Sequence, residues 1–319
     1  MITACPAPLQ PGGSGAPAPI GEQPVSAEQL LAWRRGLLRE GGRAADLDWL
    51  LDLAGGLGWQ ELQALRLHPD RPVTLERPMA DLEALWRRHL RTCEPLQYLV
   101  GRCPWRDLDL RVAPGVLIPR QETELLVDLA LDLAPVASNC GGPQHWADLG
   151  SGCGALAVAL GRALPGSRGF AVEASPVAAR QARTNLERAG LAQQVLLLEG
   201  TWWEPLAPWW GQLDVVVSNP PYIPSAVVDT LEPVVREHEP RAALDGGPDG
   251  LASVRAIVAG APRALAPGGV LLLEHHHDQS EAVLDLLHRV GLQQVQAHPD
   301  LEGVRRFASG RRCATLTEL

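Results

Sequence analysis

Residues 145–164 read HWADLGSGCGALAVALGRAL. The apolar run His145–Leu149 is followed by glycines at 150, 152 and 154, and then by a stretch of helical character, Ala155–Leu164. Glycines at these positions let the backbone turn sharply and approach a ligand closely. This stretch therefore predicts a strand, a ligand-binding turn and a helix, which together form a unit of an α/β domain.

The alternation of strand and helix continues through the rest of the chain. Helices are predicted at residues 122–134, 155–164, 176–189, 250–265 and 280–290, and strands at 145–149, 169–173, 195–199, 213–218, 270–274, 293–297 and 305–309. The middle strands are continuously apolar, as expected of strands covered on both faces. Residues 121–319 are therefore predicted to form a Rossmann-like, doubly wound parallel sheet of seven strands, with its ligand at the carboxyl ends of the strands.

The residues before this domain have a different character. Residues 1–24 are rich in Pro, Gly and Ala, which predicts a disordered tail. Residues 25–94 predict a small all-helical domain that begins at a capping box, Ser26 with Gln29, and continues with helices at 44–54, 59–67 and 79–91. Residues 95–120 predict a β-hairpin linker with strands at 96–101 and 108–112.

Composition limits the classes of protein. Of 319 residues, 46% are hydrophobic and 20% charged, so the chain can bury a sizeable core. The formal net charge of −9 makes a global electrostatic grip on nucleic acid unexpected. The six cysteines form no CxxC pair, which favours a reduced, cytoplasmic protein. The chain has no apolar run of about 20 residues that could span a membrane and no signal-peptide pattern.

Two features after the glycine loop indicate a nucleoside-bearing cofactor. Glu173 ends the second predicted strand, where a carboxylate can accept bonds from both ribose hydroxyls, although NAD enzymes place an acid there too. Trp202 and Trp203 follow the third strand, and one indole can pack on an adenine face. Alone, the glycine loop is equally compatible with a dinucleotide.

The acceptor motif Asn219-Pro220-Pro221-Tyr222 decides between these cofactors. It directly follows the apolar run Leu213–Ser218, at the same edge of the predicted sheet. The Asn219 oxygen and the Pro220 carbonyl can each accept one N–H of a planar NH2 group, and Tyr222 can cover the plane. The prolines hold φ near −65°, which keeps the acceptors rigid. A nicotinamide enzyme has no use for this turn, whereas S-adenosylmethionine fits all three features.

Four segments in this order resemble the HemK/PrmC family, the peptide-chain-release-factor glutamine methyltransferases: residues 117–124 (LIPRQETE), 148–154 (DLGSGCG), 219–222 (NPPY) and 239–247 (EPRAALDGG). The resemblance runs from about residue 26 to the end. It implies a Rossmann-like methyltransferase domain that methylates the side-chain amide of the Gln in the Gly-Gly-Gln loop of class-I release factors.

The resemblance also implies residue roles. The helical domain would dock the release factor, and the enzyme is expected to be a cytoplasmic monomer without sequence-specific binding to nucleic acid. The residues implied to bind S-adenosylmethionine are Gly150, Ser151, Gly152, Cys153, Gly154, Glu173, Trp202 and Asn219. The residues implied to bind the glutamine are Asn219, Pro220, Pro221 and Tyr222, of which Asn219, Pro220 and Tyr222 are the catalytic candidates.

The chain departs from the family pattern in places. The family often has Asp at the position of Glu173, and often an acid where this chain has Thr201, a weaker partner for the adenine amino group. The run His275–His277 is not a family feature. Because neighbours on a strand alternate faces, no metal site is expected there. Arg120 and Glu122 are expected near the mouth of the pocket.

Two other functions fit part of the pattern. A DNA or RNA adenine-amino methyltransferase shares the Asn-Pro-Pro-Tyr motif, but it would need a basic recognition region that the net acidity disfavours. A catalytically silent scaffold that only docks on the release factor or the ribosome would not need an intact acceptor turn at residues 219–222.

Overall fold

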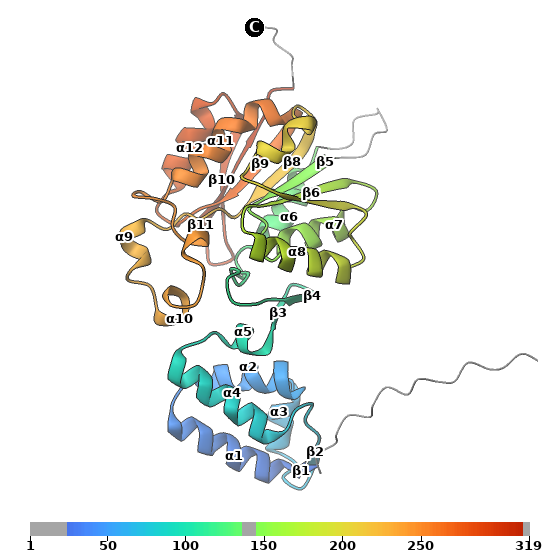
Figure 1. The fold of residues 1–319 in the computed structure, drawn as a ribbon, viewed down its shortest axis with the longest axis vertical. Helices are drawn as coiled ribbons and strands as arrows, with labels where there is room; N and C mark the ends of the chain where they lie inside the picture. Colours follow the sequence, from blue (N-terminus) through green and yellow to red (C-terminus); the bar gives the residue numbers. More distant parts are fainter. Residues whose placement is uncertain (1–23, 136–144, 315–319) are drawn as a thin grey trace, which may run out of the picture. The chain divides into compact units, whose positions relative to one another are not determined.

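The computed structural model describes residues 24–135 and 145–314. The tail predicted at residues 1–24 lies almost entirely outside the described residues. The chain divides into two compact units, with the division between Arg87 and Arg88 (Figure 1). Each unit is described by itself.

The first unit is a set of four helices with one short strand pair. Its elements are β1 (Val25–Ser26), α1 (Ala27–Glu40), α2 (Ala44–Gly55), α3 (Trp59–Leu65), β2 (Pro72–Val73) and α4 (Met79–Thr92), whose last turn crosses into the second unit. The predicted capping box is confirmed: the Ser26 hydroxyl accepts from the Gln29 backbone N–H at 3.2 Å, and the Ser26 N–H donates to the Gln29 side chain at 3.0 Å. The pairing of β1 with β2 was not predicted, because two-residue strands leave no periodicity to read.

The second unit begins with a helix where the sequence predicted a strand. Residues 96–101 form α5 (Leu96–Val100). Pro95 stands at its start, and Gly101 ends it in the left-handed conformation at φ 76°, a common way to terminate a helix. The hairpin itself lies directly afterwards, as β3 (Arg102–Trp105) and β4 (Leu108–Arg111). The strand prediction failed because a short, mostly apolar segment fits a short helix as well as a strand.

A seven-stranded sheet forms the body of this unit. The strands are β5 (His145–Leu149), β6 (Arg168–Glu173), β7 (Val195–Glu199), β8 (Leu213–Ser218), β9 (Leu265–Glu274), β10 (Gln293–Pro299) and β11 (Arg305–Arg311). Their order across the sheet is β10-β11-β9-β8-β5-β6-β7. All seven predicted strands are present. Only β11 departs from the parallel prediction, since it pairs antiparallel with both neighbours. The connection from β10 to β11 is residues 300–304, which is long enough for a hairpin but too short for a crossover.

Helices cover both faces of the sheet, so that each face has its own hydrophobic core (Figure 1). On one side lie α6 (Glu124–Leu133), α7 (Ala155–Ala163) and α8 (Pro176–Arg188), and on the other α11 (Ala252–Ala264) and α12 (Ser280–Arg289). The short helices are η1 (Glu204–Trp209), α9 (Ser225–Val228), α10 (Pro233–Arg236) and η2 (Arg241–Ala243). This is the predicted Rossmann-like, doubly wound arrangement.

Strand order reverses direction between β5 and β8. The chain moves from β5 outward to β6 and β7, then returns to β8 on the opposite side of β5 and continues to β9. Such a switch point leaves a crevice at the carboxyl ends of the two strands, which is where ligands bind in open α/β sheets. The glycine loop follows β5 and the Asn-Pro-Pro-Tyr turn follows β8, so that both motifs meet at this crevice.

Candidate active site

A cavity of about 300 Å³ lies at the switch point, within the size range of small-molecule sites. Six predicted site residues line it: Gly150, Gly152, Glu173, Trp202, Asn219 and Pro221. They come from the ends of four neighbouring strands, β5, β6, β7 and β8. The structure thus brings the predicted cofactor residues and part of the acceptor motif to one cavity.

The glycine loop owes its shape to left-handed backbone. Gly150, Gly152 and Gly154 have φ of 77°, 58° and 85°, values that glycine adopts at little cost. A Cβ at Gly150 would come within 3.2 Å of the Trp202 ring, and one at Gly154 would meet the backbone of Ala182 at 3.2 Å. Gly152 has open space instead. The loop therefore packs tightly on two sides and leaves room for a ligand at Gly152.

The Glu173 carboxylate is fixed beside this loop by hydrogen bonds to backbone N–H groups. Its carboxylate accepts the backbone N–H of Gly152 at 2.7 Å and that of Ser175 at 2.8 Å. Burial raises the pKa of Glu173, and the two backbone bonds oppose that rise. Each carboxylate oxygen keeps a further lone pair. Glu173 can thus accept hydroxyl groups from a ligand while it braces the loop.

Trp202 and not Trp203 faces the cavity. Trp202 has a positive φ of 47°, a strained conformation for a bulky residue of the kind that concentrates at binding sites. Trp203 is buried in the core, where its indole N–H donates to the Ile257 carbonyl at 2.9 Å. Thr201 also lines the cavity. Of the two tryptophans, Trp202 lines the cavity, and its packing on an adenine stays a prediction.

Five other predicted residues do not line the cavity within the described chain. The Ser151 hydroxyl donates to the Asp148 and Val172 carbonyls, and Cys153 lies in the apolar core, where burial raises its pKa to about 12. Gly154 packs against Ala182. Pro220 is buried, and the Tyr222 hydroxyl donates to Glu274 at 3.0 Å. These five residues do not line the cavity, and their roles in cofactor binding, substrate binding or catalysis stay predictions.

The opposite wall of the cavity was missed by the sequence reasoning. It is formed by residues of the hairpin exit and of the segment after the acceptor motif, namely Gly115, Val116, Leu117, Pro240, Ala242, Ala243 and Asp245. Arg120 and Glu239 join these two segments, because the guanidinium pairs with the buried carboxylate at 2.8 Å. The Ile118 N–H also donates to Glu239, at 3.3 Å. The sequence segments LIPR (117–120) and EPR (239–241) pointed to this wall. Their contact could not be predicted because they lie far apart in the sequence.

A buried carboxyl behind the glycine loop was also not assigned. Asp148, in β5, is fully buried, and neither of its carboxyl oxygens has a hydrogen-bond partner in the described residues. Burial raises its pKa to about 7, and the charge of Glu173 adds to the rise. Asp148 is not among the residues that line the cavity, and an unsatisfied buried carboxyl is costly to the fold.

Histidines 275–277 form no compact ligand set. Over residues 24–135 and 145–314, no three or more His, Cys, Asp or Glu side chains are grouped as for a metal ion. His275 is buried with its Nδ1 against the His276 carbonyl at 2.8 Å, and His276 Nδ1 lies 2.6 Å from Asp278. The helices among these same residues include none with the length and apolarity to cross a membrane.

A glycine loop, a strand-end acid and an aromatic wall at this switch point, beside an Asn-Pro-Pro-Tyr turn, define an S-adenosylmethionine-dependent methyltransferase. A family model, "Methyltransferase small domain", matches residues 131–237. Among solved structures, "hMettl16 catalytic domain in complex with MAT2A 3'UTR hairpin 1" aligns with a TM-score of 0.53 at 12% identity, covering 85% of this chain and 92% of that one. A likeness at this identity supports the fold alone.

Relatives in sequence narrow the class. The release factor glutamine methyltransferase of Prochlorococcus marinus is 50% identical over 291 residues, which cover 91% of this chain and 99% of that protein. The protein of the same name from Gloeobacter violaceus is 49% identical over 77% of this chain and 82% of its own length. The chain belongs to the release factor glutamine methyltransferase family.

Proposed function

We propose that this protein transfers the methyl group of S-adenosylmethionine to the side-chain amide nitrogen (N5) of the glutamine in the Gly-Gly-Gln loop of class-I peptide chain release factors. The observation that carries the proposal is the convergence of Asn219 and Pro221 with Gly150, Gly152 and Glu173 on one cavity. An acceptor for a planar amide and a cradle for a nucleoside thus share one space. The membership of the family supports the same substrate.

The cavity fits the cofactor. When bound, S-adenosylmethionine supplies a sulfonium-borne methyl group that a nucleophile can take. Glu173 would accept the ribose hydroxyls, Trp202 would pack on the adenine, and the loop from Gly150 to Gly154, Ser151 and Cys153 included, would approach the ligand through its backbone. The left-handed glycines and the open space at Gly152 support this placement.

The acceptor turn would overcome the weak nucleophilicity of an amide. The amide lone pair is delocalised into its carbonyl. Asn219 Oδ1 and the Pro220 carbonyl would each accept one N–H of the substrate and so fix the nitrogen, while Pro221 and Tyr222 would wall the glutamine. Holding reactants in line can remove up to about 7–11 kcal/mol of the barrier. The methylated nitrogen then loses its proton to water, so that no strong base is required.

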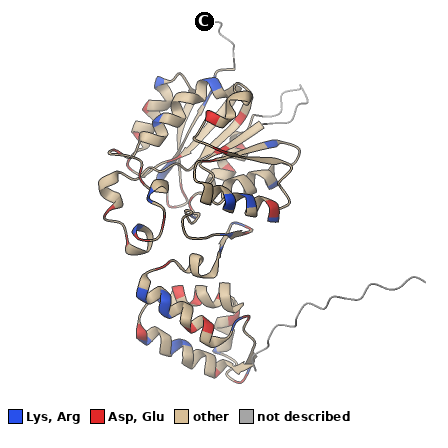
Figure 2. Ribbon diagram, in the orientation of Figure 1, with Lys and Arg blue, Asp and Glu red and all other residues tan. Residues whose placement is uncertain are grey.

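The remaining parts of the proposal concern partners and place. Residues 25–94 would dock the release factor, residues 95–120 would link the two domains, and residues 121–319 would carry the chemistry. We infer a monomer that works in the cytoplasm, where translation terminates, and that has no sequence-specific contact with nucleic acid. The net charge of −9 and the mixing of basic and acidic residues along the helices support the last point (Figure 2).

Methyl transfer to a purified release factor tests the function. The protein is incubated with S-adenosylmethionine carrying a labelled methyl group and a class-I release factor, and the Gly-Gly-Gln peptide is analysed by mass spectrometry. We expect one added methyl group on the glutamine, and none on a factor whose glutamine is replaced by alanine. Label on adenine-containing DNA or RNA would favour the adenine-amino alternative, and binding of both partners without transfer would favour a scaffold.

A further inference from the structure

A chain of hydrogen bonds runs behind the acceptor turn into the protein core. Asn219 Nδ2 donates to the Thr123 hydroxyl oxygen at 2.9 Å, and that hydroxyl donates to Glu274 Oε2 at 2.7 Å. The Tyr222 hydroxyl donates to the other oxygen, Glu274 Oε1, at 3.0 Å. Two of the four acceptor-turn residues are therefore tied to one carboxylate at the end of β9.

The direction of these bonds is set by the charge of Glu274. Burial raises the pKa of Glu274 to about 7. Above that pH the carboxylate is ionised and only accepts hydrogen bonds, so that Thr123 must donate its single hydroxyl proton to Glu274. The Thr123 oxygen can then only accept, and it accepts from the Asn219 NH2 group. A flipped amide would place Asn219 Oδ1 against the Thr123 oxygen, two acceptors with no proton between them. The network therefore selects one of the two orientations of the Asn219 amide.

The selected orientation is the one that the proposed reaction needs. With Nδ2 bonded to Thr123, Asn219 presents Oδ1 as its remaining polar atom, and this oxygen has no hydrogen-bond partner within residues 24–135 and 145–314. Asn219 lines the cavity. Oδ1 is thus available to accept an N–H of the substrate amide, whereas the flipped form would offer a second donor to a group that has only donors at its nitrogen.

The positions of Thr123 and Glu274 have no simple structural explanation. Thr123 stands at the start of α6 with its side chain 5% exposed, yet it makes no capping bond to that helix. Glu274 is 2% exposed, and the residues that the structure describes place no ion pair on it. A carboxylate buried with two neutral donors generally destabilises the fold. Their hydroxyl and carboxylate serve the turn at residues 219–222 instead.

We propose that Thr123 and Glu274 are positioning residues that lock the Asn219 side-chain amide with Oδ1 toward the acceptor nitrogen. The inference rests on the proposed methyl transfer to glutamine and adds to its site two residues that position the acceptor turn. Neither residue touches the substrate in this proposal; both act through Asn219, and Glu274 also holds Tyr222.

Substitutions at Thr123 test the lock through kinetics. Thr123→Val keeps the shape and removes the hydroxyl. With a release factor as substrate, we expect kcat to fall about 100-fold, as for a misplaced reacting group, while the Kd for S-adenosylmethionine changes less than about threefold. Thr123→Ser restores the hydroxyl and should recover most of kcat. Thr184→Val, which removes an exposed hydroxyl from α8, is the matched control and should behave as wild type. Wild-type kcat in Thr123→Val, or no recovery in Thr123→Ser, would overturn the proposal.

Glu274 is tested by a double-mutant cycle. Glu274→Met fills the buried space without acceptors and leaves the Thr123 hydroxyl free to donate to Asn219 Oδ1. Because both residues act through one amide, the double variant with Thr123→Val should be no slower than the slower single variant. If the loss of kcat in the double variant equals the product of the losses in the two single variants, the two residues act independently, which would contradict the proposal.

An activity-free measurement separates this inference from the proposed function. The side-chain NH2 signals of Asn219, assigned by their loss in Asn219→Ala, should be protected from hydrogen exchange in the wild-type protein and exchange at least about tenfold faster in Thr123→Val. If the Asn219 side-chain NH2 group of the wild-type protein is not protected from exchange, the positioning role of Thr123 and Glu274 is contradicted even if methylation occurs. A protected amide in a protein that transfers no methyl group to a release factor would instead refute the proposed function alone.

Discussion

Asn219 and Glu173 line the same cavity, but we expect substitutions at the two positions to change different constants. Asn219→Ala removes the proposed acceptor of the substrate amide, and we expect kcat to fall about 100-fold or more, with a smaller change in the cofactor Kd. Glu173→Ala removes a charge-assisted bond worth roughly 1.5–3 kcal/mol, which raises the cofactor Kd by about 10- to 100-fold. Isothermal titration and steady-state kinetics separate the two constants. Equal losses in both constants for Asn219→Ala would count against its assigned role.

Asp148 illustrates the cost of a fully buried carboxyl without a hydrogen-bond partner in the described residues. Its pKa is raised from 3.8 to about 7 in the folded protein, so that the folded state binds this proton more tightly than the unfolded state does. The stability it contributes is fully present below about pH 4 and is lost as the pH rises through about 7. Asp148→Asn keeps the shape without the charge. The variant should therefore gain more thermal stability over the wild type at pH 8 than at pH 5.

This comparison is made without cofactor, by thermal unfolding at the two pH values. Glu274, whose pKa burial also raises to about 7, titrates in the wild type and the variant alike and cancels from the difference. We expect the stabilised variant to bind S-adenosylmethionine more weakly, a common exchange between stability and function. A stability difference that does not change with pH would show that Asp148 is not the titrating group.

Residues that depend on local sequence were predictable, and residues that depend on distant contacts were not. Glu173 ends one predicted apolar strand and Trp202 comes three residues after another, which placed both at the cavity. Thr123 meets Glu274 across 151 positions of sequence. A single sequence contains no signal for such a pair, although Glu274 ends an apolar strand in the same way as Glu173 does.

Among the elements, most apolar strands and amphipathic helices were found nearly to their ends, because burial on both faces leaves a strong pattern. The failures were α5, the direction of β11 and the start of β9, which begins at Leu265 rather than at the predicted residue 270. A segment of five residues such as Leu96–Val100 carries no usable periodicity. The direction of a last strand follows from the length of its connection rather than from its own composition. The pattern of an element predicts its type; its neighbours decide its pairing.

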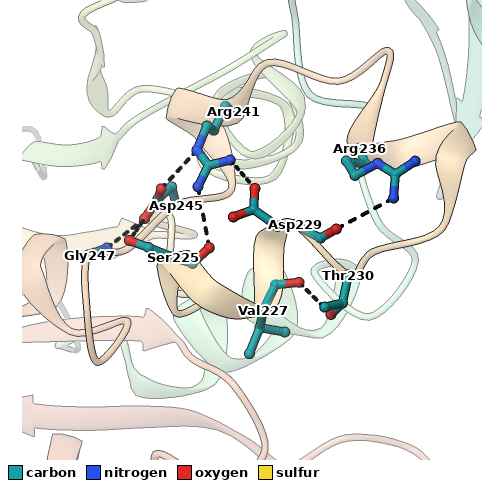
Figure 3. A network of polar contacts seen from close by, with 8 residues as sticks. All are labelled: Ser225, Val227, Asp229, Thr230, Arg236, Arg241, Asp245 and Gly247. Atoms are coloured by element: carbon teal, nitrogen blue, oxygen red, sulfur yellow. Dashed lines mark hydrogen bonds and ion pairs between the residues drawn. The ribbon is translucent and has the colours of Figure 1, made fainter.

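The segment between β8 and α11 forms part of the cavity wall and depends on Arg241 for its shape. Figure 3 shows the guanidinium between Asp229, at 2.5 Å, and Asp245, at 3.1 Å, with the Ser225 carbonyl at 3.3 Å. Asp245 also accepts from the Ser225 hydroxyl and the Gly247 N–H, and it lines the cavity. Arg241 thus joins the start and the end of this wall.

Arg241→Ala should therefore weaken binding more than folding. Exposed ion pairs contribute little to stability because solvent screens them, so that the unfolding midpoint should move little. The loosened wall should raise the Kd for S-adenosylmethionine several-fold and expose residues 225–245 to limited proteolysis. Arg236→Ala is the matched control, since Arg236 bonds the Asp229 carbonyl (Figure 3). It also bonds Glu237, but not Asp245. Equal effects of the two variants would remove Arg241 from this role.

At the scale of the whole molecule, a cavity of about 300 Å³ is of the size of a small-molecule site and far too small for a protein. Recognition of a release factor must then use surface outside the cavity, and we propose the helical unit for it. That unit exposes two large apolar side chains around α3: Trp59, 65% exposed, and Leu67, 77% exposed. Exposed aromatic residues are frequent anchors of protein interfaces.

Trp59→Ser and Leu67→Ser test this division of labour between the two units. If the helical unit docks the release factor, each variant should raise the KM for the intact factor, by about tenfold for Trp59, which is equivalent to about 1.4 kcal/mol, with kcat unchanged. A short Gly-Gly-Gln peptide is too small to reach a separate docking surface, so that its KM should not change. Val177→Ser, at a half-exposed position on α8, controls for the loss of a surface apolar group. An unchanged KM for the intact factor would exclude these two side chains as the anchor, and equal increases for factor and peptide would place the defect in the cavity.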